Sequence, residues 1–555
     1  QWFSLPLAGL QEMAEQIELD MEKAYDNYLS HRPQTFETSA CSSQPSPYAV
    51  TFSGENIKKI LQDETQIQKT LPNYHYRPSQ EELAVRVGQS FKNKVHALVQ
   101  APTGTGKTMG YLLPSILFCL NEGEKVLVAT GTKALQHQAM HKDIPEMRQL
   151  LDLDDEKLKV TQVIGSNNHL CELLFSQEEE QDSLIFRSRS FEEKYSQIYF
   201  GLIFLYNVDQ KYGEKVIRGD IPYVLKKIFP KISEWEEKVA VDYRSCTGHR
   251  CPFKGSCSYL TGLSQARESH LIVGNHALMF TWPKGVPRPL YVIVDEAHKI
   301  EGEATRAYSL EVTESQLMGL EKMLGSSHGL GPLFYLLGSM AETNEGGHNN
   351  SDTMAKLRTA ASDTARMLAD HLGPLRDMVG LLFNKMPRYT PDYWNELAFD
   401  GKIFETDPLG QSIKFHLESL KNILHHFLLD LSPYIIRFRE ALPGSDQGMS
   451  AFAKFETFYS TILDAHHTLE EGLDLSQEKH VCRSLWYVER EGFKLGVAPV
   501  DVGKLIHEQL LVPAQSVVFT SATLANEKGD QGPQGIEWAT GYSYLEPSRR
   551  FKGGL

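Results

Sequence analysis

The chain has 555 residues, of which 56 are Lys or Arg and 71 are Asp or Glu, so its formal net charge is −15. This length exceeds what one hydrophobic core supports, and we expect about two to four domains. The acidic balance gives no general indication of nucleic-acid binding, although a local basic groove on an acidic body remains compatible with it.

The compartment is also constrained by the sequence. No apolar run of about 18 residues or more predicts a membrane-spanning helix. The start, Gln1 to Ser4, lacks the basic and apolar regions of a signal peptide, and the seven cysteines are too unevenly spaced for a disulfide framework. We therefore expect a cytoplasmic protein with no membrane contact. The missing initial Met predicts a fragment or a processed chain.

The N-terminal segment, up to about residue 70, fits a compact domain poorly. An amphipathic helix is predicted from Leu10 to Tyr28, and the Ser-, Pro- and Thr-rich stretch from Pro33 to Tyr48 reads as a linker.

Polar residues then precede a helix predicted over Glu81 to Phe91. Arg77 and Gln80, with neighbouring aromatic residues, can hold an adenine ring by stacking and paired amide hydrogen bonds. The alternative is an ordinary helix start capped by Ser79. The position just ahead of the next motif favours the adenine site.

That motif is QAPTGTGKT at residues 100–108, between the apolar run Val95 to Val99 and a helical run from Met109 to Leu120. Strand, tight loop and helix form the context of a P-loop, in which glycines let backbone N–H groups turn toward phosphate oxygens. Its lysine would reach the β- and γ-phosphates and its last threonine would bind Mg²⁺. The predicted nucleotide-binding residues of the loop are Thr103, Gly104, Thr105, Gly106, Lys107 and Thr108.

The strict P-loop pattern fails at its first position, Ala101, so a second element is needed. An apolar strand from Tyr291 to Val294 ends in Asp295 and Glu296, with His298 two residues on. Asp295 would hold Mg²⁺ through its hydration shell, and Glu296 would orient or deprotonate the attacking water. Either motif alone fits a solvated strand end equally well, but the two in this order indicate nucleotide hydrolysis.

Other apolar runs predict an α/β fold with a parallel sheet. Strands are expected at 125–130, 160–164 and 271–278, alternating with helical patterns. Thr130 and Thr132 lie at a predicted strand end, where hydroxyl groups can contact a nucleic-acid backbone.

Four cysteines interrupt this alternation. Three of them fall within 12 residues, and Gly248 and Gly255 near them indicate a loop rather than a core. Such thiols can ligate zinc, with His249 as a further candidate, or a 4Fe-4S cluster, and spacing alone does not decide between these metals. Four buried free cysteines are the remaining alternative. The four candidate ligands are Cys171, Cys246, Cys251 and Cys257.

A long, mostly helical insertion is predicted at 305–480, after which a sheet pattern resumes at 485–495. A last strand, Ser516 to Thr520, is followed by the S-A-T sequence that contains Ser521 and Thr523. These hydroxyls at a strand end can bond to the Asp295–Glu296 loop and relay the nucleotide state.

The ordered set of motifs (Arg77 and Gln80, APTGTGKT, four cysteines, DEAH, SAT) resembles the XPD-like iron–sulfur DNA helicases of superfamily 2, most closely the DinG type, over about residues 70–540. The resemblance implies a RecA-like P-loop NTPase sheet with an iron–sulfur insertion and a helical arch insertion, and the cofactors ATP, Mg²⁺ and a 4Fe-4S cluster held by the four cysteines. It also implies 5′–3′ translocation on single-stranded DNA, action on forked or flapped DNA, coupling through His298, and a monomer.

The domains expected from this resemblance are residues 1–70 (N-terminal helix and linker), 71–165, 269–304 and 481–555 (three parts of motor domain 1), 166–268 (iron–sulfur domain) and 305–480 (arch). The family's second motor domain, which carries the arginine fingers, is absent, so we expect this chain to be a fragment that hydrolyses ATP weakly. One alternative is a nucleotide-regulated DNA-binding protein without motor activity. Another is a zinc protein with an incidental P-loop.

Overall fold

The computed structural model describes the ranges 50–175, 226–227, 230–283, 285–326, 329–343, 350–387, 389–399, 401–440, 445–474, 481–523 and 532–552. The helix predicted at Leu10 to Tyr28 and the linker after it lie outside these ranges. Among the described helices, none is both long and apolar enough to cross a membrane.

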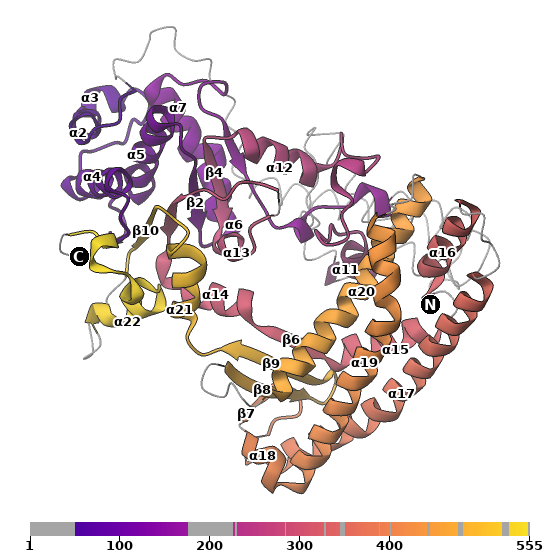
Figure 1. Cartoon of the computed structure of the whole chain (residues 1–555). Helices are drawn as coiled ribbons and strands as arrows, with labels where there is room; N and C mark the ends of the chain where they lie inside the picture. Colours follow the sequence, from indigo (N-terminus) through magenta and orange to yellow (C-terminus); the bar gives the residue numbers. More distant parts are fainter. Residues whose placement is uncertain are drawn as a thin grey trace, which may run out of the picture.

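Six parallel strands form the first sheet, in the spatial order β1-β10-β5-β2-β4-β3 (Figure 1). Their bounds are β1 Ala97–Gln100, β2 Val126–Thr130, β3 Val160–Gln162, β4 Leu271–Asn275, β5 Tyr291–Asp295 and β10 Ser516–Ser521. The late strand β10 lies between β1 and β5, so distant parts of the chain complete one sheet. This sheet confirms the predicted α/β class and is consistent with a RecA-like fold.

Both faces of the parallel sheet are covered, which explains why its strands are apolar throughout rather than alternating. On one face, Val128 and Ile293 pack with helices on the N-terminal side of the chain. These are α2 Gly54–Gln62, α3 Glu64–Ile67, α4 Pro78–Asn93, α5 Lys107–Glu122 and α7 Ile144–Leu151. Helices α2 and α3 were not predicted, and their buried Ile57, Ile60 and Ile67 belong to this core.

The opposite face buries Leu127, Val292 and Phe519 against a second set of helices. These are α12 Ser258–Glu268, α13 His276–Phe280, α14 Ile300–Tyr308 and α21 Val502–Ile506, with the π-helical turn His507–Leu511. The short helix α6 Lys133–Gln138 continues into another π-helical turn, Ala139–Asp143. Two further described helices are α11 Pro230–Lys238, which lies between Cys171 and Cys246 in the sequence, and α22 Gly532–Ala539.

A second sheet is antiparallel and has the order β6-β9-β8-β7. Its strands are β6 Leu310–Thr313, β7 Asn395–Phe399, β8 Val481–Val488 and β9 Gly492–Pro499. From the sequence we predicted that residues 481–499 belong to the motor domain. In the structure these residues form the hairpin β8–β9 of the separate antiparallel sheet. The physical signal is the alternation in β8, where Leu485 and Tyr487 are buried and Trp486 between them is half-buried, as expected for a sheet covered on one face.

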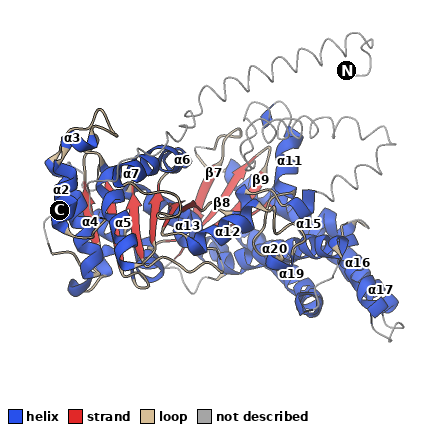
Figure 2. Cartoon of the chain, turned by 90° about the horizontal axis from the view of Figure 1, so that it is seen from above, coloured by secondary structure: helices blue, strands red, loops and turns tan. Residues whose placement is uncertain are grey.

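A group of helices packs in one core with the buried face of the second sheet (Figures 1 and 2). They are α15 Glu314–Gly325, α16 Gly331–Thr343, α17 Asn350–Asn384, α18 Gly401–Thr406, α19 Pro408–Glu440 and α20 Asp446–Leu473. The longest of them are α17, α19 and α20. Figure 2 shows β7, β8 and β9 between the parallel sheet and these helices. The predicted helical character of 305–480 is therefore present, interrupted by β6 and β7.

Candidate nucleotide-binding site

Three of the predicted motifs meet at one edge of the parallel sheet. The P-loop follows β1, the DEAH sequence follows β5, and the SAT sequence ends β10, which lies between them. Ligands of open α/β sheets bind at the carboxyl ends of parallel strands, where loops converge. The strand order thus brings together residues that are separated by more than half of the chain.

The P-loop backbone adopts the conformation for which glycine is suited. Gly104 has φ +82° and Gly106 has φ +77°, both in the left-handed region that other residues avoid. Gly106 immediately precedes α5, so the positive end of that helix faces the loop. Such an N-terminus with turned N–H groups is an anion-binding arrangement.

Gln80 and Arg77 lie against this loop. The Gln80 amide Nε2 donates a hydrogen bond to the Gly106 carbonyl over 2.9 Å. A Cβ atom at position 106 would lie 2.2 Å from Gln80 Nε2 and 3.3 Å from Arg77 Nη1. Within the described residues, the buried Gln80 Oε1 accepts no hydrogen bond, which leaves an acceptor next to the loop.

Lys107 and Glu296 connect the P-loop to the DEAH loop directly. Lys107 Nζ lies 3.0 Å from Glu296 Oε1, and Glu296 Oε2 lies 3.4 Å from His298 Nδ1. Glu296 has φ +52°, an uncommon conformation for a residue with a Cβ, and this turns its side chain toward the loop. Strained backbone of this kind is concentrated at functional sites.

Asp295 is buried and held from several sides. Its Oδ1 accepts a hydrogen bond from the Glu296 backbone N–H over 2.9 Å, and its Oδ2 accepts one from the Tyr111 hydroxyl over 3.2 Å. Its carbonyl oxygen lies 2.6 Å from His276 Nε2. Burial raises the pKa of Asp295, an effect that the Lys107 ammonium opposes and the Glu296 carboxylate reinforces.

The sequence did not single out Tyr111 or Asp143, which both lie near Asp295. Burial is the main cause that raises the pKa of each, and the Asp295 carboxylate contributes to both shifts. Asp143 ends the π-helical turn Ala139–Asp143, a type of irregularity that is frequent at functional sites. The position of Tyr111, one helical turn after Thr108, was the available signal.

Ser521 links the third motif to the other two. Its Oγ lies 2.8 Å from His298 Nδ1, and its backbone carbonyl accepts a hydrogen bond from the Ala101 N–H over 2.9 Å. The Thr523 N–H donates to Ser521 Oγ over 3.4 Å. The serine therefore contacts both the start of the P-loop and the DEAH loop.

The threonines expected near a nucleic acid have local partners. Thr132 begins helix α6, where its Oγ1 accepts a hydrogen bond from the Leu135 N–H. The Thr130 hydroxyl donates to the Thr132 carbonyl over 3.3 Å. Both hydroxyls thus shape the turn between β2 and α6.

The four cysteines lie in segments that contact one another. The segment around Cys171 is hydrogen-bonded to the segment before Cys246, because the Cys171 N–H donates to the Val239 carbonyl. His169 Nδ1 lies 2.9 Å from Ser258 Oγ, next to Cys257. Burial raises the pKa of the Cys171 thiol to about 11, and nearby Cys246 and Cys251 add to this shift. Among the described residues, no three His, Cys, Asp or Glu side chains converge on a common metal position.

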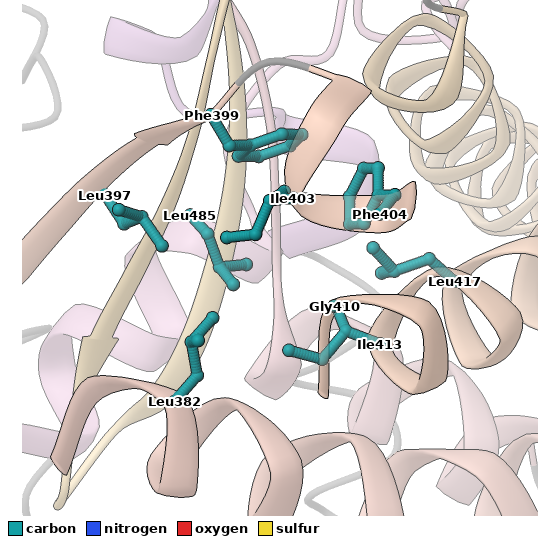
Figure 3. Close-up of a pocket in the computed structure, with 9 residues that line it drawn as sticks. All are labelled: Leu382, Leu397, Phe399, Ile403, Phe404, Gly410, Ile413, Leu417 and Leu485. Atoms are coloured by element: carbon teal, nitrogen blue, oxygen red, sulfur yellow. The ribbon is translucent and has the colours of Figure 1, made fainter. Parts of the chain in front are cut away.

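One apolar pocket lies away from these motifs, between the second sheet and its helices (Figure 3). Its free volume is about 10 Å³, about the space of one water molecule. Its lining residues are Leu382, Leu397, Phe399, Ile403, Phe404, Gly410, Ile413, Leu417 and Leu485. A dry gap of this size is a packing feature rather than a substrate site.

The parallel sheet, the P-loop and the paired strand-end carboxylates have the arrangement of a P-loop nucleotide-binding fold and are consistent with the RecA-like class. Comparison with known proteins shows which family of P-loop proteins this chain resembles. Residues 78–190 match the DEAD/DEAH box helicase family. The chain is 26% identical over 279 residues to the ATP-dependent DNA helicase YoaA of Haemophilus influenzae, which covers 48% of this chain and 39% of the relative.

Two further relatives carry the DinG name. The 3'-5' exonuclease DinG of Bacillus subtilis is 23% identical over 495 residues, covering 84% of this chain and 48% of the relative. The ATP-dependent helicase DinG of Mycobacterium tuberculosis is 28% identical over 255 residues, covering 43% and 37%. A solved XPD helicase aligns over 84% of this chain and 61% of its own, with a TM-score of 0.39 and 15% identity.

These relatives confirm the resemblance predicted from the sequence: residues 78–190 are similar to the DEAD/DEAH box helicase family, and the chain is similar to the DinG and YoaA helicases. The chain spans less than half of the length of each of these three curated relatives.

Proposed function

We propose that this protein is an ATP-dependent 5′–3′ DNA helicase of the DinG type, which couples ATP hydrolysis to movement along single-stranded DNA. The observation that supports this most strongly is the bonded connection of three motifs at one sheet edge, through Lys107 to Glu296 and Ser521 to His298. A motor needs such a connection, because the state of the nucleotide has to reach the loops that hold its track.

The adenine is assigned to the side of the P-loop where Arg77 and Gln80 lie. The unpartnered Gln80 Oε1 can accept from the adenine amino group, while Nε2 keeps its bond to the Gly106 carbonyl. The planar Arg77 guanidinium can stack on the base. This arrangement favours adenine, because guanine presents a carbonyl where adenine has its amino group.

The phosphates are assigned to the turned backbone of 103–106 and to Lys107. A γ-phosphate would attract the Lys107 ammonium away from Glu296 and free that carboxylate to orient the attacking water. Thr108 and Asp295 would hold Mg²⁺, which when bound neutralises charge on the β- and γ-phosphates. Lys107 would therefore exchange a carboxylate partner for a phosphate partner on nucleotide binding.

His298 is assigned to coupling, since it lies between Glu296 and Ser521. If Glu296 moved toward the attacking water, its carboxylate would move away from His298. The imidazole would then shift against Ser521 at the end of β10, from which the chain leaves the parallel sheet.

The four cysteines fit a 4Fe-4S cluster by their chemistry. They supply the four thiolates that such a cluster requires, from two segments that contact each other through the Cys171 N–H and the Val239 carbonyl. In a cubane each thiolate binds a different iron, so the sulfur atoms need not converge on one point. Cys171, Cys246, Cys251 and Cys257 would hold the cluster, which when bound ties their two segments together.

Iron and acid-labile sulfide analysis of anaerobically purified protein tests this assignment. We expect about four irons per chain, with a broad absorption band near ~400 nm that dithionite bleaches. Cys257→Ser should lose iron, whereas Cys482→Ser, at an exposed cysteine of β8, should retain it. One zinc and no iron would overturn the cluster and leave a structural zinc site.

The substrate class proposed is single-stranded DNA, with forked or flapped duplexes to unwind, and the active unit proposed is a monomer. Strand displacement by the full-length protein, from a duplex with a 5′ single-stranded tail, tests the function, with a 3′-tailed duplex as the control for direction. ATP-dependent displacement of the 5′-tailed substrate alone is expected. Binding of ATP and DNA without displacement would overturn the motor and support a nucleotide-regulated DNA-binding protein.

A further inference from the structure

Tyr111 lies at the back of the cation position assigned to Thr108 and Asp295. It is one helical turn after Thr108 on α5, so the two side chains share a face of the helix. Only 2% of Tyr111 is exposed, and a buried tyrosine hydroxyl requires hydrogen-bond partners. Its partner is the Asp295 carboxylate, whose Oδ2 lies 3.2 Å from the Tyr111 hydroxyl oxygen.

The direction of this hydrogen bond follows from the groups involved. An ionised carboxylate only accepts, so the Tyr111 O–H donates to Asp295 Oδ2.

These contacts matter for a cation. A carboxylate binds a cation through the lone pairs that its hydrogen bonds leave free. The Tyr111 O–H on Oδ2 and the Glu296 N–H on Oδ1 together fix the rotation of the Asp295 carboxylate, and with it the direction of the remaining lone pairs.

We propose that Tyr111 is a positioning residue of the Mg²⁺ site, which orients the Asp295 carboxylate toward the cation without touching it. This inference rests on the proposed nucleotide site. Its consequence is specific, because the tyrosine hydroxyl should influence the metal requirement rather than the recognition of the base or the phosphates.

Tyr111→Phe removes only the hydroxyl. Binding of a fluorescent N-methylanthraniloyl ATP analogue, titrated at a series of Mg²⁺ concentrations, should show that the variant needs about tenfold more Mg²⁺, the effect of one hydrogen bond to a charged group. At saturating Mg²⁺ and in EDTA, the affinity for the analogue should equal that of the wild type.

Tyr74→Phe is the matched control. Tyr74 is also buried, and its hydroxyl donates to the Leu61 carbonyl over 2.7 Å, remote from Asp295. It should lose a comparable hydrogen bond and keep the wild-type Mg²⁺ dependence. Thermal melting of both variants reports the structural cost separately from the metal requirement.

Three results would contradict the proposal. A wild-type Mg²⁺ dependence in Tyr111→Phe would overturn the positioning role alone. An equal change in Tyr74→Phe would assign the effect to general packing. Failure of the wild-type protein to bind the analogue at any Mg²⁺ concentration would overturn the proposed nucleotide site, and with it this inference.

Discussion

Lys107 Nζ lies 3.0 Å from Glu296 Oε1, so the predicted phosphate-binding cation and the predicted water-activating carboxylate are ion-paired with each other. Both side chains are largely shielded, with exposed fractions of 12% and 24%. The pair therefore opposes nucleotide binding to some extent, because a phosphate has to replace the carboxylate at Lys107.

Glu296→Gln should separate binding from hydrolysis. The amide has nearly the same shape but carries no charge, so Lys107 loses its competing partner and the affinity for ATP should be retained or increased. Hydrolysis should fall about 10²- to 10⁴-fold, the usual contribution of a general base. Equilibrium binding and steady-state phosphate release measure the two effects.

Glu301→Gln is the control, because Glu301 is an exposed carboxylate in the first turn of α14, just after the DEAH loop. It should change neither quantity. Unimpaired hydrolysis by Glu296→Gln would show that another group activates the water.

Gly106→Ala should be more damaging to stability than Gly104→Ala. Both glycines have φ near +80°, so both substitutions carry the left-handed penalty of about 1–2 kcal/mol. Only at position 106 does the new Cβ meet a neighbour, Gln80 Nε2 at 2.2 Å, since nothing lies within 4 Å at position 104. Thermal denaturation of the two variants compares them, and equal melting temperatures would show that Gln80 moves aside freely.

Much of this site could be predicted because its motifs are local. The P-loop can be recognised in one continuous sequence segment around Lys107, and the strand that ends in Asp295 can be recognised in another. Their meeting required only the general behaviour of parallel strands, whose carboxyl ends share an edge. The roles of the individual residues stay predictions.

The parts that could not be predicted depend on contacts between distant residues. Tyr111 and Asp295 are 184 positions apart, so the spacing of Tyr111 from Thr108 could suggest a place near the P-loop but not a contact with this carboxylate. The antiparallel sheet was missed for a related reason. Its strand β6 has only four residues, and β9, with which it pairs, lies far along the chain.

Ser521→Ala should uncouple DNA unwinding from ATP hydrolysis. The substitution removes the only side-chain oxygen that Ser521 presents to His298, at 2.8 Å, and leaves its backbone contact with Ala101 intact. In the full-length protein we expect nearly normal DNA-stimulated hydrolysis and strongly reduced strand displacement, measured in parallel on one 5′-tailed duplex.

Thr523→Ala provides the comparison within the same motif. The contact described for Thr523 is through its backbone N–H, which alanine keeps, so coupling should persist in this variant. Uncoupling by Thr523→Ala but not by Ser521→Ala would move the coupling role to the threonine.

Acid should destabilise the fold partly through His96, which joins β1 to the C-terminal segment. Val517 N–H donates to its Nδ1 over 3.0 Å, and Arg549 Nη2 lies 2.7 Å from its Nε2. Burial lowers the pKa of His96 to about 3, and the charges of Arg549 and His507 act in the same direction. In the unfolded chain the imidazole titrates near its ordinary value of about 6.5.

The sign follows from proton uptake. Between about pH 6.5 and 3 the unfolded chain binds a proton that the folded chain excludes, so the stabilisation is complete above pH 6.5 and is lost as the pH falls. The slope from this group is about 1.4 kcal/mol per pH unit. His96→Asn, which keeps an acceptor near Nδ1 but does not titrate, should be less stable at pH 7.5 and lose less stability on acidification. Chemical denaturation between pH 7.5 and 5 measures this. His75→Asn, at an exposed position, should keep the wild-type slope, and the same slope in His96→Asn would assign the acid sensitivity to other groups.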